Sequence, residues 1–337
     1  MPEGPLVVRR HPDAAALVAR RARLLAALRA WLDARELLEA DVPALLPYAG
    51  QEAHLRPPRA EIDGLAGPLW LQTSPELALK RLVGAGAHRV YALGAAYRGG
   101  PEELSRLHQP QFTLLEWYRP GNSAGDLIED VQGLGAAAAA ALGVAPPAAS
   151  RILSLSEACR ELAGLSLEPL LAGDLAGFTA AAARAGLPTG AGDSPETAFG
   201  RVLAGAIEPR LADVEGWVFL HGFPACAAAL ARLDPADPRV ALRVEAYLGG
   251  IEIANGWVEL DDPAEIRRRW KHDRSLRDGA PIPWDEALLA ELAARRGPPT
   301  VGMALGVDRL MLALTGASRL EDVLPLSLAR APRAEPL

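Results

Sequence analysis

Cysteine is nearly absent from this chain of 337 residues, and so are long apolar runs. The two cysteines, Cys159 and Cys226, lie far apart and without the spacing of metal ligands, so neither a disulfide framework nor a zinc site is expected. The N-terminus lacks the apolar stretch of a signal peptide, and the longest apolar run, residues 136–149, is mostly alanine with two prolines. The sequence therefore predicts a cytoplasmic protein without a membrane segment.

An excess of positive charge is also missing, since the formal net charge is -7. Broad, sequence-independent binding of nucleic acid depends on cations that contact phosphates, so this class is not expected, although a local basic patch remains compatible. Lys80 and Lys271 are the only lysines, and the preference for arginine is best attributed to genome composition. With 50% hydrophobic residues, the chain can bury the core of one large α/β domain or two small ones.

The most informative stretch is residues 91–121, where two runs rich in aromatic and aliphatic residues flank a loop with two glycines and a proline. This pattern predicts two antiparallel strands with a long connection. A nucleotide suits the polar residues gathered here, because a guanidinium binds phosphate and an aromatic ring stacks on a base. An ordinary surface hairpin with scattered charges is the alternative. The polar and aromatic candidates are Arg98, Glu102, Glu103, His108, Phe112 and Glu116.

A second hairpin is predicted at residues 243–260, with the glycine pair 249–250 as its turn. In a regular register Glu245 pairs with Ala254, and Glu245 and Glu252 become diagonal neighbours on one face, about 7 Å apart at Cα. Two such carboxylates repel each other unless a cation lies between them. Mg²⁺ bound to ATP phosphates is the natural candidate, since it takes one or two protein carboxylates; a solvated strand face is the alternative.

Glu259 has the wrong parity to share that face on a regular strand. A bulge at Asn255-Gly256 would bring it there, and glycine is the usual residue for such an irregularity.

Residues 302–316 combine a strand of small residues with a helix that begins near Gly306. A helix start favours anions, and Arg309 in the first turn suits a terminal phosphate. The alternative is an Arg309 that only pairs with Asp308 or Glu321.

Helical spacing predicts a helix at residues 13–35 with Asp13 as N-cap, another that follows Ser74 as N-cap with Pro75 at its first position, and a third at residues 124–142. Residues 151–211 are predicted to be mostly helical.

Three segments of the chain resemble motifs 1, 2 and 3 of class II aminoacyl-tRNA synthetases, in the lysine, asparagine and aspartate group. Motif 1 is Leu-Leu-Glu-Ala-Asp-Val-Pro-Ala-Leu-Leu at residues 37–46, motif 2 is the stretch from Tyr-Arg to Glu-Trp-Tyr at residues 97–118, and motif 3 is residues 302–316. The resemblance implies an α+β fold, with an antiparallel sheet flanked by helices, and a homodimer. It places a catalytic domain at residues 13–328 with a helical insertion at 151–211, between an extension at 1–12 and a tail at 329–337.

The resemblance also implies a role for each motif residue that binds ATP. Arg98 would hold the α-phosphate, Arg309 the γ-phosphate, and Phe112 would stack on adenine. Glu102 and His108 would lie on the loop around the nucleotide, and Glu245 and Glu252 would bind Mg²⁺ and ATP.

For the amino acid, the resemblance to lysine-activating enzymes implies five further residues. Ser74 and Glu76 belong to a Ser-Pro-Glu site whose glutamate holds the α-amino group; a favourable charge at a helix start is the alternative for Glu76. Asn255 would approach the carboxylate, and Glu259, assisted by Tyr118, would pair with the ε-ammonium. A buried carboxylate can select such an ammonium because leaving its charge unpaired costs several kcal/mol.

The chain is similar to the short bacterial paralogues of lysyl synthetases that join (R)-β-lysine to a lysine of translation elongation factor P. Only about a dozen residues precede the first predicted helix, whereas tRNA-charging relatives carry an anticodon-reading domain at this place. His-Gly-Phe-Pro-Ala at residues 221–225 and Ala304, where lysyl synthetases usually have Gly, support this. The resemblance implies an ATP-dependent ligase for which tRNA is not the expected acceptor. A tRNA-independent ligase for α-lysine or another amino acid and an inactive regulator remain alternatives.

Motif 2 departs from the family pattern. Gly-Gly-Pro stands between Arg98 and Glu102, a two-residue insertion, and Gln109 and Gln111 replace the usual Asn and acid. These changes affect the predicted loop contacts to ATP.

Overall fold

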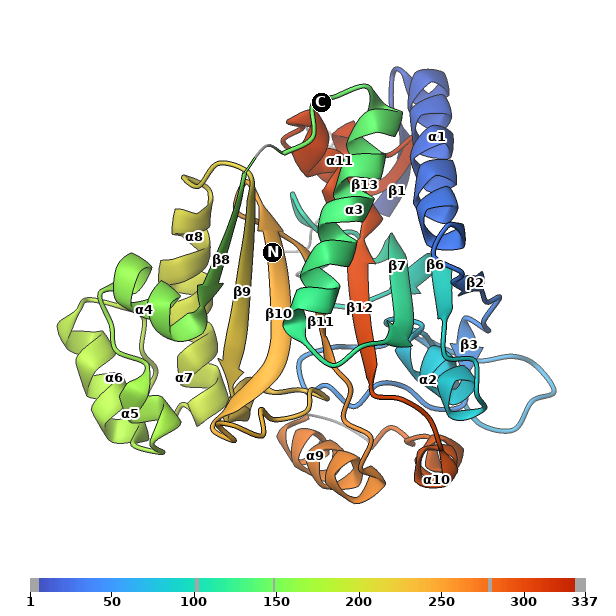
Figure 1. The fold of residues 1–337 in the computed structure, drawn as a ribbon. Helices are drawn as coiled ribbons and strands as arrows, with labels where there is room; N and C mark the ends of the chain where they lie inside the picture. Colours follow the sequence, from blue (N-terminus) through green and yellow to red (C-terminus); the bar gives the residue numbers. More distant parts are fainter. Residues whose placement is uncertain (1–5, 101–102, 148, 278–280, 331–337) are drawn as a thin grey trace, which may run out of the picture.

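Eight strands form one sheet through the centre of the protein (Figure 1). The computed structural model describes residues 6–100, 103–147, 149–277 and 281–330. In spatial order the strands are β2 (Leu38–Glu39), β6 (Val90–Tyr97), β7 (Gln111–Pro120), β12 (Thr300–Gly306), β11 (Ile251–Val258), β10 (Val240–Leu248), β9 (Trp217–Pro224) and β8 (Ser150–Ser154). Neighbours are antiparallel except at the two edges, where β2–β6 and β8–β9 are parallel. The predicted α+β fold is confirmed.

Helices α1 (Ala14–Asp33) and α3 (Ala124–Leu142) pack side by side over one face of the sheet (Figure 1). The leucines of α1 recur at helical spacing and are buried, and α3 is bounded by a capping box at Ser123 and a left-handed Gly143. Strand β7 alternates accordingly: Trp117 points to this face and donates to Asp130 of α3 at 3.0 Å. Side chains on either side of Trp117 therefore point to the opposite face.

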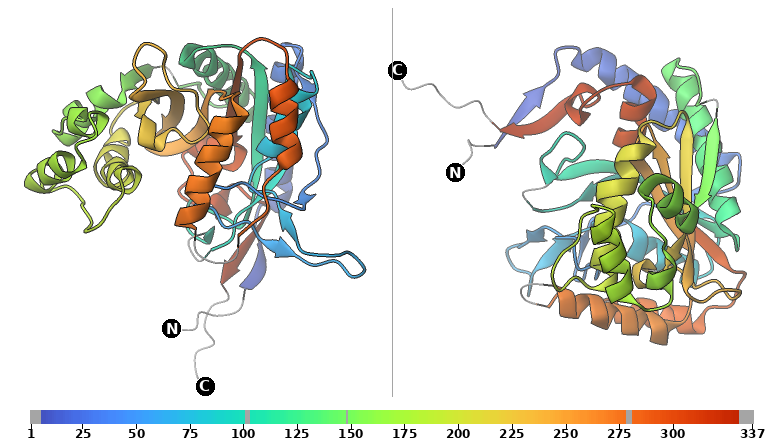
Figure 2. Two further views of the ribbon diagram at one scale, coloured as in Figure 1. Left: turned by 90° about the horizontal axis from the view of Figure 1, so that it is seen from below. Right: turned by 90° about the vertical axis from the view of Figure 1, so that its left-hand side faces the viewer.

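A set of short helices covers the β8–β9 edge of the sheet (Figures 1 and 2). They are α4 (Leu155–Ala163), α5 (Glu168–Leu171), α6 (Leu175–Arg184), α7 (Pro195–Val202), a π-helical turn (Leu203–Ile207) and α8 (Glu208–Leu211). Their core is separate from that under α3 and includes Phe178, Phe199 and Phe223. The region predicted to be helical from residue 151 begins with β8 instead, since Ser150–Ser154 pairs with β9.

The remaining elements frame the open face and the ends of the sheet. They are the ribbon of β1 (Leu6–Arg10) and β13 (Leu326–Arg330), the small sheet of β3 (Leu45–Leu46), β5 (Leu69–Leu71) and β4 (Arg59–Ala60), the helices α2 (Glu76–Gly84), α9 (Pro263–Leu276), α10 (Glu286–Ala294) and α11 (Val307–Thr315), and 3₁₀ turns at Ala225–Ala227 and Leu320–Asp322. Figure 2 shows the β1–β13 ribbon projecting from the body. No helix in the described part of the chain is long and apolar enough to span a membrane.

The structure confirms the position of one predicted helix start and corrects the other. Asp13 stands at the N-cap of α1, but its side chain makes no capping hydrogen bond, and its own N–H donates to His11 Nδ1 at 3.0 Å. Helix α2 begins at Glu76, so Pro75 occupies the N-cap position and not the first helical position. Ser74 still satisfies one free N–H, because its Oγ accepts from the Glu76 amide at 3.2 Å.

Candidate active site

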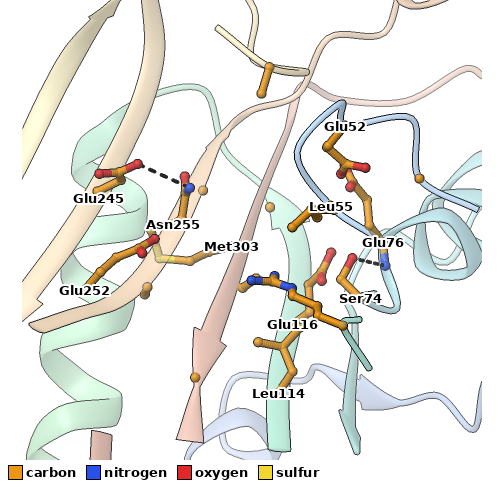
Figure 3. Close-up of a pocket in the computed structure, with 18 of the residues that line it drawn as sticks. Glu52, Leu55, Ser74, Glu76, Leu114, Glu116, Glu245, Glu252, Asn255 and Met303 are labelled. Carbon is orange, nitrogen blue, oxygen red and sulfur yellow. Dashed lines mark hydrogen bonds between the residues drawn. The ribbon is translucent and has the colours of Figure 1, made fainter. Parts of the chain in front are cut away.

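The open face of the sheet forms the floor of a cavity of about 380 Å³ (Figure 3). All but one of the residues with predicted site roles line it; the exception, Glu102, lies outside the described residues. The twelve are Ser74, Glu76, Arg98, His108, Phe112, Tyr118, Glu245, Glu252, Asn255, Glu259, Ala304 and Arg309. Segments far apart in the sequence thus meet in one place, while the assigned role of each residue stays a prediction.

Strand register explains why these side chains share a face. One row of paired residues crosses four strands, and the next row lies two residues further along each strand, so both rows point the same way. The first row is Glu116, Ala304, Asn255 and Glu245; the second is Tyr118, Gly302, Trp257 and Arg243.

The register of the acidic hairpin differs from the prediction at one residue. Glu245 pairs with Asn255 and not with Ala254, because the strands shift where Ile253 is inserted between Glu252 and Ala254. A bulge was predicted, but at Asn255-Gly256, which was the wrong position. The extra residue reverses the parity of the strand, so that Asn255 and, beyond the strand end, Glu259 line the same cavity as Glu252.

Gly256 has a different reason to be glycine. A Cβ at this position would lie 2.4 Å from the carbonyl oxygen of Gly302 on the neighbouring strand. The residue is needed for close approach of two backbones and not for a bulge.

At one end of the cavity Arg309 contacts three residues. It lies 3.4 Å from Glu252 Oε2 and 2.7 Å from His108 Nε2, and it donates to the carbonyl of Leu107 at 3.3 Å. Asp308 pairs instead with Arg21, at 2.7 Å. The alternative of an Arg309 engaged with Asp308 is therefore wrong, and the guanidinium faces the cavity.

Arg98 lies beside Phe112, with its guanidinium carbon 5.1 Å from the ring centroid. Its Nε is buried and has no hydrogen-bond partner among the described residues. A buried donor left without a partner costs free energy, so this side chain is suited to receive an anionic ligand in the cavity.

Glu245 is buried and surrounded by donors. It accepts hydrogen bonds from Arg243 and from the Tyr247 hydroxyl, both at 2.6 Å, and from Asn255 at 3.3 Å (Figure 3). Burial raises its pKa to about 7, the Arg243 charge opposes this, and the nearby Glu252 charge adds to it. Glu252 is 38% exposed and shares one oxygen with Arg309. Two adjacent carboxylates, one of them open, fit the needs of a Mg²⁺ ion that also binds phosphate.

The other end of the cavity contains an ion pair that sequence reasoning missed. Lys80 is only 4% exposed, and its Nζ lies 2.6 Å from Glu76 Oε1 and 2.8 Å from Glu259 Oε2. Both carboxylates predicted to hold ammonium groups of the substrate thus already bind an ammonium of the protein. The i,i+4 spacing of Glu76 and Lys80 was the available signal.

Glu116 is a second residue without a predicted role in substrate binding. It is 3% exposed, accepts from the Tyr118 hydroxyl at 2.7 Å, and leaves its Oε2 buried without a hydrogen-bond partner in the described chain. Burial raises the pKa of Glu116 to about 8 and that of Glu259 to about 7. Glu116 is two residues from Tyr118 on the same strand, so the two side chains point to the same face; this spacing could have placed Glu116 in the cavity.

Comparison with known proteins identifies the family of the chain. The family described as tRNA synthetases class II (D, K and N) matches residues 5–329. The protein named elongation factor P–(R)-β-lysine ligase from Edwardsiella ictaluri is 36% identical, over 93% of this chain and 95% of its own. Proteins of the same name from Vibrio cholerae and Haemophilus influenzae are 35% and 34% identical, over 92% and 93% of this chain and 95% of theirs. The chain therefore belongs to the class II tRNA synthetase family of the aspartate, lysine and asparagine type.

Proposed function

We propose that this protein is an ATP-dependent ligase that activates (R)-β-lysine, or lysine, as an aminoacyl-adenylate and transfers it to a lysine side chain of elongation factor P. The observation that carries this proposal is one cavity lined both by Arg98 and Arg309 and by Glu76 and Glu259, which pair with the buried Lys80. A phosphate chain and a diamino acid have the complementary charges. The relatives, 34–36% identical, bear the name of this activity.

In the first step the substrate carboxylate attacks the α-phosphorus of ATP, a new P–O bond forms, and pyrophosphate leaves. Arg98 holds the α-phosphate, Arg309 holds the leaving group, and Phe112 stacks on adenine, with Glu102 and His108 on the surrounding loop. Mg²⁺, held by Glu245 and Glu252, would supply positive charge to the phosphates. Positioning and electrostatic stabilisation account for the rate.

In the second step the acceptor amine attacks the carbonyl carbon of the mixed anhydride. The new amide bond forms as AMP leaves with the electrons of the broken C–O bond, and the amine loses a proton. No side chain is required as a covalent nucleophile, because the anhydride is already activated.

The amino acid lies at the acidic end of the cavity in this proposal. Glu76, on the turn at Ser74, holds the amino group next to the carboxylate, which Asn255 approaches. Glu259, with Tyr118, holds the ammonium of the side chain, and we add Glu116, whose buried Oε2 needs a donor. The ammonium of the substrate side chain can pair with Glu259 and Glu116. A neutral side chain in the same pocket would leave the buried charge of these carboxylates unpaired.

Ala304 supports a preference for the β-amino isomer. It lies between Glu116 and Asn255 in the row of paired residues, so its methyl group fills space that glycine would leave open to an α-amino group. The A304G variant is expected to shift the ratio of kcat/KM from (R)-β-lysine toward α-lysine, as measured by ATP–pyrophosphate exchange. An unchanged ratio would contradict this role.

The acceptor is tested by incubating the enzyme with purified elongation factor P, ATP and either lysine isomer, and measuring intact mass. We expect a mass increase of one lysyl residue with (R)-β-lysine. An unchanged mass together with active pyrophosphate exchange would remove the acceptor, and a parallel reaction with tRNA would show whether it takes that place. A translation factor as acceptor places the enzyme in the cytoplasm.

We further propose a homodimer formed through motif 1. Leu38 lies in motif 1 on β2, the edge strand of the sheet, and is 69% exposed, and an exposed edge strand can pair with a second chain. Light scattering on the purified protein is expected to give twice the chain mass, and the L38E variant is expected to give a monomer.

A further inference from the structure

We infer that Lys80 is a positioning residue for amino-acid selection: its ammonium bridges Glu76 and Glu259 and holds the two carboxylates in place at the cavity. This inference deepens the proposed function and rests on it for the identity of the substrate. The ion pairs themselves do not depend on it.

The bridge connects two parts of the chain that are distant in sequence. Glu76 and Lys80 lie one turn apart on α2, and Glu259 follows the end of β11. The Lys80 Nζ is also 5.7 Å from the Trp257 ring centroid, which favours a cation at this place. Lys80 therefore fixes the position of α2 against the floor of the cavity.

The bridge holds Glu259 against the cavity. Its Oε2 lies 2.8 Å from Lys80 Nζ, and neither of its buried oxygens makes a well-formed hydrogen bond with another described residue. Its Oε1 lies near Gly302, where an added Cβ would be 2.5 Å away. Gly302 and Glu259 both line the cavity, so the carboxylate lies at the region where the substrate is proposed to bind.

The charges around Lys80 explain why a cation is needed here. Glu76, Glu259 and Glu116 act on one another and on Lys80, and Tyr118 lies next to Glu116. Three neighbouring carboxylates without a cation would repel one another and take up protons. A protonated carboxyl cannot form the ion pair that selects an ammonium. Burial lowers the pKa of Lys80, but ion pairing with Glu259 and Glu76 outweighs it and holds that pKa above its usual range, so the ammonium of the bridge stays charged at neutral pH.

The first experiment uses the unmodified protein. The chain has only two lysines, so ¹⁵N labelling of lysine Nζ gives two ammonium signals, and the exposed Lys271 is an internal control. We expect the Lys80 signal to remain that of an ammonium beyond the ordinary lysine pKa of about 10.4, and to shift when the amino acid is added but not with ATP alone. A Lys80 signal that loses its ammonium character near this ordinary lysine pKa would overturn the inference, whatever the substrate is.

The second experiment compares the variants K80M and K271M in ATP–pyrophosphate exchange. Breaking a buried ion pair leaves uncompensated charge, so K80M is expected to lose about 100-fold in kcat/KM for the amino acid, mostly through KM, while KM for ATP changes less than about twofold. K271M is expected to match the wild type. Equal losses for ATP and the amino acid would instead indicate a purely structural role and contradict positioning.

Chemical rescue separates positioning from folding. In K80A the missing ammonium can be supplied by propylamine, and we expect saturable recovery of activity that propanol does not give. If neither K80M nor K80A folds, K80R keeps the charge; its wider guanidinium is expected to raise KM for the amino acid alone. Recovery by propanol as well, or K80R with wild-type KM values, would contradict the inference. Absence of pyrophosphate exchange in the wild type would refute the proposed function, but not the bridge seen by NMR.

Discussion

The two ends of the cavity solve opposite electrostatic problems. At the end proposed for the nucleotide, Arg309 and Glu252 pair while partly exposed, and the buried Glu245 pairs with Arg243. At the end proposed for the amino acid, Glu76 and Glu259 share the ammonium of Lys80, and Glu116 is buried nearby. A phosphate chain is charged and hydrated, so partly exposed groups can bind it. The amino-acid pocket must instead select a side chain that ends in an ammonium over one that ends in an apolar group. Under the proposed assignment, the buried carboxylates paired with one buried ammonium provide the selectivity.

The largest effect is expected at the nucleotide end. R309A removes the cation proposed to hold the leaving pyrophosphate, and loss of one such group costs about 1,000-fold in rate. ATP–pyrophosphate exchange should fall by this amount while KM for the amino acid stays within about threefold. R268A, at an arginine on α9 that is 70% exposed, is the control. A loss shared equally between the two substrates would break the division of the cavity into two ends.

A smaller effect is expected from E259Q at the amino-acid end. The amide keeps the shape of the side chain but loses its ion pairs with Lys80 and the substrate, which are buried. KM for the amino acid should rise about 100-fold with KM for ATP unchanged. E161Q, at an exposed ion pair with Arg151, should behave as the wild type. A rise in KM for ATP instead would assign Glu259 to the nucleotide.

Packing at the amino-acid end is tested by G302A. An added Cβ would lie 2.3 Å from Tyr118 Cε1 and 2.5 Å from Glu259 Oε1, so both side chains must move. Such overpacking costs about 2 kcal/mol, and kcat/KM for the amino acid should fall about 30-fold. G200A is the matched control, because nothing lies within 4 Å of its new Cβ in α7, and it should raise the free energy of unfolding by about 0.5–1 kcal/mol. Full activity of G302A would place the substrate elsewhere.

The smallest effect concerns pH. The pKa of Glu116 is raised to about 8 and that of Glu259 to about 7, so the free protein holds protons that a bound ammonium displaces. Amino-acid affinity should rise about fivefold to tenfold between about pH 7 and 8.5, with proton release measurable by calorimetry in buffers of different ionisation enthalpy. ATP affinity should rise less, about twofold, because the pKa of Glu245, proposed to hold Mg²⁺, is raised to about 7.

The same pKa shifts determine whether the free energy of unfolding rises or falls with pH. The folded state binds these protons more tightly than the unfolded chain does, so the free energy of unfolding of the free protein should fall as pH rises from the unfolded carboxyl value of about 4.3 to about 8. The E116Q variant, which carries no proton to lose, should show a weaker decline in thermal unfolding experiments. An equal decline in both proteins would remove Glu116 as the source.

Sequence reasoning predicted the fold and the residues that line the cavity, because motifs such as Arg98 with Phe112 combine residue type, spacing and strand parity. It did not predict the bridge by Lys80, since that contact joins α2 to the end of a strand far along the chain. The site of the bulge was also missed. Its position depends on Ile253, which is buried in the core under α3, and tertiary packing of this kind leaves no local pattern.

The inserted Ile253 has a consequence for how the site tolerates change. A chain in which that single residue is deleted would keep Glu245, Asn255 and Glu259, and even a continuous strand. Regular alternation would then turn Asn255 and Glu259 toward α3 and bring apolar neighbours out to the nucleotide. A substitution on β11 changes one side chain of the binding surface. A shift of the strand register by one residue would instead turn every side chain of that segment to the opposite face.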